Sequence, residues 1–114
     1  MTEAYTPGAG DLVWTVFDPA KGREQQGRRP ALVLSPRGLS ASTGFVIVAP
    51  IASRVRPFPT SVVLPEGLPI SGEILLNQIR SIDSLARPVK SMNAKVPSAV
   101  AEQVRAKLAL LIAI

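Results

Sequence analysis

The residues best suited to chemistry lie between Asp18 and Arg29, in the segment with the densest positive charge of the chain. Its charged side chains after Asp18 are Lys21, Arg23, Glu24, Arg28 and Arg29. A guanidinium group carries its N–H donors in a planar fork that fits two phosphate oxygens at once. The segment also holds Pro19 and two glycines but no apolar pattern. We therefore predict a basic loop that meets phosphate.

The composition of the whole chain supports a polyanionic partner. The 114 residues include 13 lysines and arginines against 8 acidic residues, a net charge of +5 that is typical of nucleic-acid-binding domains. The chain has neither cysteine nor histidine, which excludes disulfides, thiolate metal sites and the commonest general base. Its carboxylates are scattered, so we predict no metal and no other cofactor. The plainer alternative is a small basic domain that binds nothing specific.

Short apolar runs between turn residues predict a single mainly β domain of the α+β class over residues 1–114. The expected strands are residues 11–17, 31–34, 44–50, 60–64, 73–82 and 87–92, with a break near Gln78 and a polar turn at 38–43. This spacing indicates a small, strongly bent barrel. From Ser98 onward, apolar residues recur every three or four positions, which predicts a C-terminal helix over one end of the barrel.

Three further features concern partners and location. The connection at residues 51–59 is also basic and carries Arg54 and Arg56. Residues 110–114 are all apolar, which is more than a surface helix needs and suggests a dimer contact. The first ten residues lack a signal-peptide pattern and no apolar run is long enough to span a membrane. We therefore expect a cytoplasmic protein.

The run GDLVWTVFDPAKGREQQGRRPALVLSP at residues 10–36 resembles the N-terminal signature of the MazF/PemK (Kid) toxins. These are sequence-specific endoribonucleases of bacterial toxin–antitoxin modules. The resemblance continues through APIASRV at 49–55 and ILLNQIRSIDSLAR at 74–87 to the final helix. It implies a homodimer of SH3-like barrels that binds single-stranded RNA along the dimer interface and cleaves it without metal. It also implies a cognate antitoxin whose C-terminal segment occupies the RNA groove.

The resemblance assigns roles to individual residues. In the implied reaction the RNA 2′-hydroxyl attacks the phosphate and leaves 2′,3′-cyclic phosphate and 5′-hydroxyl ends. Arg29 matches the catalytic arginine, and because a guanidinium group keeps its proton, electrostatic stabilisation suits it best. Glu24 matches a position tied to activity and would orient Arg29 or accept a proton, unless it is only a solvated loop carboxylate. The residues expected to bind RNA are Lys21, Arg23, Arg28, Arg54, Arg56, Asn77, Gln78 and Arg80.

Two positions depart from the family pattern. Relatives usually have a threonine that hydrogen-bonds the scissile phosphate where this chain has Ala52, and the nearest hydroxyl belongs to Ser53. We expect that Ser53 takes the catalytic role or that catalysis is weaker. Asn77 stands where many relatives have aspartate, and an amide preserves hydrogen bonding but not proton transfer. A weakened member that binds RNA or antitoxin without cutting stays open as an alternative.

A toxin of the CcdB type is the other alternative, because such toxins have a similar barrel but poison DNA gyrase by contact. They depend on a C-terminal Trp-Gly-Ile. This chain ends Leu-Ile-Ala-Ile and has its single tryptophan at position 14, which argues against gyrase as its target.

Overall fold

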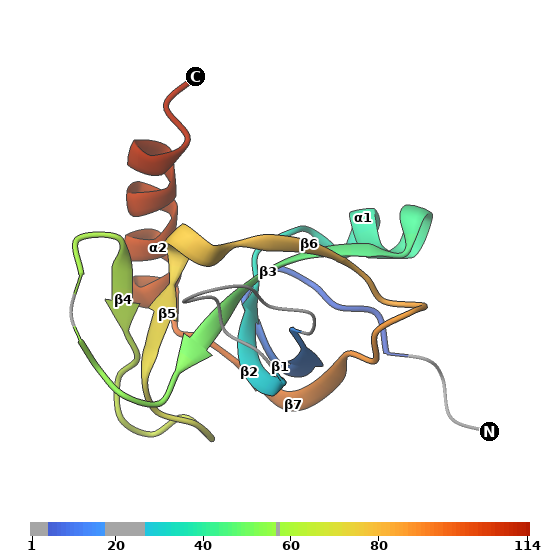
Figure 1. The fold of residues 1–114 in the computed structure, drawn as a ribbon, viewed down its shortest axis with the longest axis horizontal. Coiled ribbons are helices and arrows are strands. Elements are labelled where there is room, and N and C mark those ends of the chain that lie inside the picture. Colours follow the sequence, from blue (N-terminus) through green and yellow to red (C-terminus); the bar gives the residue numbers. More distant parts are fainter. Residues whose placement is uncertain (1–4, 18–26, 57) are drawn as a thin grey trace.

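The computed structural model of the chain describes residues 5–17, 27–56 and 58–114 (Figure 1). Its elements are β1 (Asp11–Val16), β2 (Arg28–Val33), α1 (Arg37–Thr43), β3 (Phe45–Ala52), β4 (Ser61–Val63), β5 (Glu73–Leu75), the 3-10 helix η1 (Leu76–Gln78), β6 (Arg80–Asp83), β7 (Lys90–Lys95) and α2 (Ser98–Leu111). The expected mainly β fold of short antiparallel strands with a C-terminal helix is confirmed.

Strand β3 lies at the centre of the sheet because three other strands pair with it. Along one edge it pairs with β2, with Ala31 opposite Pro50. Along the other edge, its first half pairs with β6 and its last residues pair with β5. The short helix η1 separates β5 from β6, so the expected break near Gln78 is confirmed. The remaining order is β4-β5-β3-β2-β1-β7.

Alternation along the strands builds two apolar cores. The first core lies between the sheet and α2, and its members include Leu12, Leu32, Ile51, Ile74, Val100 and Val104. The second core comprises Val13, Phe17, Ala31, Val33, Val46, Val48 and Ile82. Successive strand residues point to opposite faces. Odd-numbered positions of β1 and β2 therefore face the second core.

The helix α2 covers the first core with Val100 and Val104, both almost fully buried. Figure 1 shows the C-terminal end of this helix projecting beyond the sheet. The apolar side chains at that end are exposed, namely Leu110, Leu111, Ile112 and Ile114. Among the described residues, no helix is both long enough and apolar enough to cross a membrane.

The expected polar turn at residues 38–43 is wrong, because α1 occupies this segment. Hydroxyl groups stabilise the short helix from within: Ser42 donates to the Gly38 carbonyl at 2.8 Å and Thr43 donates to the Leu39 carbonyl at 2.7 Å. The helix ends at Gly44, whose φ of 79° is left-handed and favours glycine. Small polar residues favour turns, but here the Ser42 and Thr43 hydroxyl groups donate to helix carbonyls.

Candidate active site

Arg28 and Arg29 lie on β2 and not in a loop. Arg28 pairs with Val16 and Arg29 pairs with Thr15 in the β1–β2 ladder, so the strand begins before the expected residue 31. The ladder is extended because the Phe17 N–H donates to the Gly27 carbonyl at 2.9 Å. This hydrogen bond brings together the two residues that flank the segment 18–26. Both arginines therefore leave from a regular strand and not from the expected loop.

The two arginines point to different faces of the sheet because they are neighbours on one strand. Arg28 is exposed, and its guanidinium carbon lies 5.3 Å from the centre of the Trp14 ring, a cation–π contact. Arg29 is half-buried and shares its face with Val33 of the second core. The Thr15 hydroxyl beside Arg29 is buried and has no hydrogen-bond partner among the described residues.

Ala52 and Ser53 lie where β3 ends. The β2–β3 register pairs Ala31 with Pro50, and extending it by two residues sets Ala52 opposite Arg29. Ala52 thus shares a face with Arg29 but offers no hydroxyl. Ser53 is exposed and follows the last residue of the strand. Its role as the phosphate donor stays a prediction.

The β3–β4 loop, residues 53–60, carries the second set of cations. Arg54 and Arg56 are exposed on it. The loop is attached to Glu73 of β5, which is only 2% exposed. One carboxylate oxygen, Oε1, accepts from the Arg56 backbone N–H at 3.0 Å, and Oε2 accepts from the Ser61 hydroxyl at 2.9 Å. Sequence reasoning missed Glu73, although an acidic residue inside the apolar run GEILL was a usable signal.

The remaining expected RNA contacts fall on η1 and β6. Asn77 is exposed and Gln78 is half-buried at the turn between β5 and β6. Arg80 has a structural role, since its Nη1 donates to the Phe17 carbonyl at 2.9 Å. Its guanidinium carbon also lies 5.7 Å from the centre of the Phe17 ring. Arg87 donates to the Val16 carbonyl at 3.1 Å. Two arginines thus hold the end of β1, and RNA binding by Arg80 stays a prediction.

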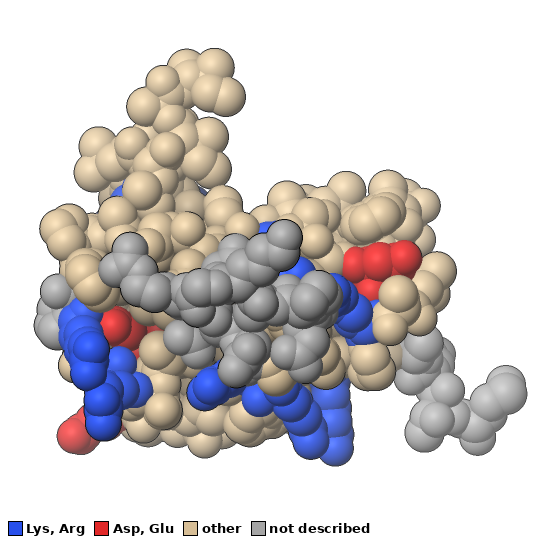
Figure 2. Space-filling view, viewed as in Figure 1, with Lys and Arg blue, Asp and Glu red and all other residues tan. Residues whose placement is uncertain are grey.

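Three expected site residues, Lys21, Arg23 and Glu24, lie outside the described residues. For the rest of the chain, Figure 2 shows the visible Lys and Arg side chains mostly along the lower part of one face. The projecting end of α2 lacks them. This uneven distribution gives the molecule a basic side on which an extended anion can lie.

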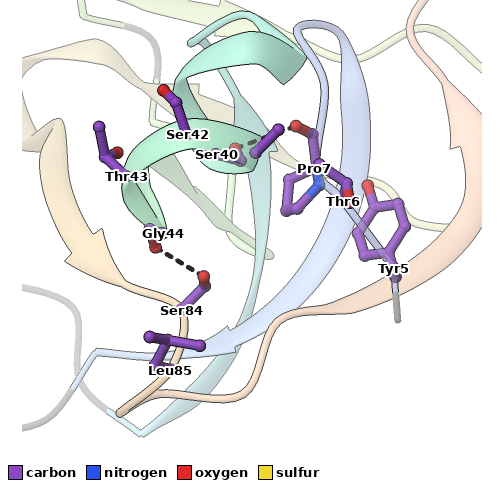
Figure 3. Close-up of a pocket in the computed structure, with 10 residues that line it drawn as sticks. Tyr5, Thr6, Pro7, Ser40, Ser42, Thr43, Gly44, Ser84 and Leu85 are labelled. Carbon is purple, nitrogen blue, oxygen red and sulfur yellow. Dashed lines mark hydrogen bonds between the residues drawn. The ribbon is translucent and has the colours of Figure 1, made fainter. Parts of the chain in front are cut away.

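A different kind of feature lies at the other end of β3, beside α1. It is an open pocket of about 420 Å³ between α1, the segment before β1 and the turn after β6 (Figure 3). Several of its hydroxyl groups are engaged by the fold: Ser40 donates to the Pro7 carbonyl at 3.1 Å and Ser84 donates to the Gly44 carbonyl at 2.6 Å. The pocket has a hollow shape but little polar chemistry to offer a ligand.

The same end is anchored by Asp11, which is 6% exposed. Its carboxylate accepts from the Tyr5 hydroxyl at 2.5 Å and from the Gly8 N–H at 3.0 Å. Arg37 and Lys95 approach it to 3.7 and 3.6 Å. Burial, reinforced by the hydrogen bond to Asp11, raises the pKa of Tyr5 well above its ordinary value. These contacts tie the N-terminal segment, α1 and β7 together.

Comparison with known proteins identifies the family. Residues 9–112 match the family model described as PemK-like, MazF-like toxin of type II toxin–antitoxin system. The chain is 38% identical over 112 residues to the endoribonuclease toxin MazF of Escherichia coli K12. This alignment covers 98% of this chain and 99% of that protein. It is 39% identical over 99 residues to the endoribonuclease toxin ChpB of the same strain, which covers 82% of this chain and 84% of that protein.

Solved structures support the same family assignment. The crystal structure of MazF from Deinococcus radiodurans superposes with a TM-score of 0.90 at 42% identity, covering 97% of this chain and 100% of that one. A MazE–MazF structure from the same organism gives a TM-score of 0.85 at 42% identity, covering 97% and 99%. The match runs over almost the whole chain and includes every element of the candidate site. The chain therefore belongs to the PemK/MazF family of toxins of type II toxin–antitoxin systems.

Proposed function

We propose that this toxin cleaves single-stranded RNA, such as mRNA, at specific sequences and without metal, by transesterification at Arg29. The chain is an endoribonuclease of the MazF type, as its relatives' names state for them. The observation that carries the mechanism is the position of Arg29. It is fixed in the β1–β2 ladder opposite Thr15, and β2 pairs with β3, whose last residue, Ala52, precedes the basic β3–β4 loop.

Transesterification needs little from the protein beyond a fixed, positively charged group such as Arg29. The RNA 2′-oxygen bonds to phosphorus and loses its proton, while the bond to the 5′-oxygen breaks and that oxygen gains a proton. The phosphorane formed between these events carries extra negative charge on its oxygens, which a fixed guanidinium stabilises. We assign this role to Arg29, with Glu24 as the group that orients Arg29 or accepts the proton. Ser53 is the candidate donor to the phosphate.

Metal-free cleavage fits the donor set of the chain. Cysteine and histidine are absent from its sequence. In the part of the chain that the structure describes, no three acidic residues gather into a group that could hold a metal ion.

RNA binding would use the exposed cations around this site. Arg28, Arg54 and Arg56 are exposed, and Asn77 and Gln78 lie on the turn that separates β5 from β6. Lys21, Arg23 and Arg80 complete the proposed set. Arg28 stacked on Trp14 forms a flat surface on which a base can stack.

The partner of such a toxin is an antitoxin protein, as the MazE–MazF structures illustrate for a relative. We propose that the C-terminal segment of the cognate antitoxin occupies the same basic groove as RNA and so blocks cleavage. We also propose a homodimer, supported by the exposed apolar residues Leu110, Leu111, Ile112 and Ile114 at the end of α2. The cytoplasm remains the expected place of action.

The direct test is incubation of the purified chain with a long single-stranded RNA in EDTA. We expect cutting at a limited set of sites that is unaffected by chelation. Binding without cutting would favour the catalytically weakened alternative. Neither binding nor cutting, together with inhibition of DNA gyrase, would favour the CcdB-like alternative.

A further inference from the structure

We infer that Glu73 is a positioning residue for RNA binding, which fixes the β3–β4 loop and through it Arg54 and Arg56. The inference rests on the proposed function, because it concerns the cations that we assign to RNA. Glu73 itself is buried and cannot touch a polynucleotide. Its effect must therefore pass through the loop.

The carboxylate holds the loop at two places. Its Oε1 accepts the Arg56 backbone N–H at 3.0 Å in the middle of the loop. Its Oε2 lies 2.9 Å from the Ser61 hydroxyl, which also lies 3.1 Å from the Phe58 carbonyl. The hydroxyl has one hydrogen, and the Glu73 oxygen is the closer of the two acceptors. The same hydroxyl accepts the Phe58 N–H at 3.1 Å, so the hydrogen bonds run from Glu73 through Ser61 into the loop.

Glu73 is itself firmly placed by the sheet. It pairs with Ala52 on one side and with Val63 on the other, so its backbone joins the strands that enter and leave the loop. Gly72 precedes it with a φ of 136°, and a Cβ there would lie 2.0 Å from the Ala52 carbonyl oxygen. At Gly72, the chain therefore lies closer to β3 than a residue with a side chain would permit. This close approach keeps the Glu73 carboxylate next to the loop.

The kind of contact matters as much as its place. A buried carboxylate costs free energy unless donors satisfy it. Among the described residues, Glu73 takes these donors from a backbone N–H and a hydroxyl and not from a guanidinium. Arg56 is thus held by its main chain while its side chain stays exposed. An ion pair would instead have neutralised the charge that a phosphate requires.

The test is a double-mutant cycle on RNA affinity. The probe is a mixed-sequence single-stranded RNA with 2′-O-methyl groups throughout, which removes the nucleophile and leaves the phosphates. Glu73→Val keeps a buried strand position filled with a β-branched side chain but removes both acceptors. We expect it to weaken binding about tenfold, the scale of one lost contact to a charged group. In an Arg54→Ala/Arg56→Ala background, the same change should alter binding less than about twofold, since coupled residues are not additive.

Conservative variants and a matched control complete the design. Glu73→Gln keeps an acceptor for the Arg56 N–H and should restore most of the affinity. Ser61→Ala cuts the second attachment, and it carries the same test if Glu73→Val does not fold. Asp11→Asn, at the other buried carboxylate, should lower the melting temperature without changing RNA affinity.

An equal loss of affinity in both backgrounds would overturn the inference and leave Glu73 with a structural role only. No loss in either background would do the same. If the unmodified chain failed to bind the RNA at all, the proposed function would fail instead.

Discussion

The two ends of the sheet use positive charge in opposite ways. At the α1 end, Arg37 and Lys95 are also exposed, but each approaches the buried carboxylate of Asp11 to within 4 Å, so part of their charge serves the fold. At the other end, the buried carboxylate of Glu73 binds a backbone N–H and a hydroxyl, and Arg54 and Arg56 remain exposed. The contrast teaches that the partner of a buried carboxylate decides whether a nearby cation stabilises the protein or can meet an external anion.

The pocket and the exposed arginines of the β3–β4 loop also lie at different ends of the sheet. The open pocket lies beside α1, where serine hydroxyls donate to backbone carbonyls (Figure 3). Arg54 and Arg56 lie beyond the far end of β3, roughly 25 Å away for eight strand residues at about 3.3 Å each. A single strand of RNA extends over a surface and does not need an enclosed hollow. We therefore do not place the proposed RNA site in the hollow.

The strongest way to test the contrast is to remove one arginine from each end. Arg29→Ala should reduce RNA cleavage by at least about two orders of magnitude, the scale of losing a preorganised donor to an oxyanion. Its melting temperature should stay close to that of the unmodified chain. Arg37→Ala is the matched control and should lower the melting temperature while leaving cleavage by the folded protein unchanged. Unchanged turnover in Arg29→Ala would remove Arg29 from the mechanism.

The next effect concerns the hydroxyl near the phosphate. If Ser53 has replaced the missing threonine, Ser53→Ala should slow cleavage about ten- to a hundredfold, in line with one hydrogen bond to a charged group. Ala52→Thr should then help little. If the donor is simply absent, Ser53→Ala should be silent and Ala52→Thr should speed cleavage, because Ala52 shares the face of Arg29. Single-turnover rates of the two variants distinguish these cases, and two silent variants would exclude both positions.

At the α1 end, Asp11→Asn should reduce the free energy of unfolding by about 1–3 kcal/mol, because several donors lose a charged acceptor. Urea unfolding measures this loss. Cleavage per folded molecule should not change. A drop in cleavage without a change in stability would show that the two ends are coupled and would break the comparison.

The smallest effect concerns Thr15, the buried hydroxyl beside Arg29. Its hydroxyl has no hydrogen-bond partner among the described residues. Replacing such a hydroxyl by an apolar group of the same shape is neutral or stabilising, so Thr15→Val should raise the free energy of unfolding by up to about 1 kcal/mol. Cleavage should stay unchanged. Slower cleavage by a fully folded Thr15→Val protein would instead assign its hydroxyl to the phosphate site.

The fold was largely predictable from the sequence because apolar alternation and turn residues are local signals. The break near Gln78 and the helix from Ser98 were both expected from such patterns. The helix α1 was not, because its serine and threonine side chains satisfy helix carbonyls instead of forming a turn. The early start of β2 depends on a hydrogen bond between Phe17 and Gly27, which are separated by the whole basic segment.

The sequence names the residues of the candidate site, whose roles stay predictions, but it does not show their arrangement. The basic motif pointed to Arg28 and Arg29, yet only the register shows that they lie on a strand and leave it on opposite faces. Glu73 was missed because a carboxylate in an apolar run makes sense only when its partners, distant in sequence, are known. The use of Arg80 to hold the Phe17 carbonyl was likewise invisible in the sequence.

The central claim is that this chain cleaves RNA through the RNA's own 2′-hydroxyl at the Arg29 end of the sheet. The most direct measurement starts by mapping one cleavage site in EDTA and then replaces the 2′-hydroxyl next to that bond with hydrogen. We expect the unmodified RNA to yield a 2′,3′-cyclic phosphate and a 5′-hydroxyl, and the substituted RNA to bind with similar affinity but stay intact. Cleavage of the substituted bond, or cleavage only when divalent metal is added, would contradict the claim.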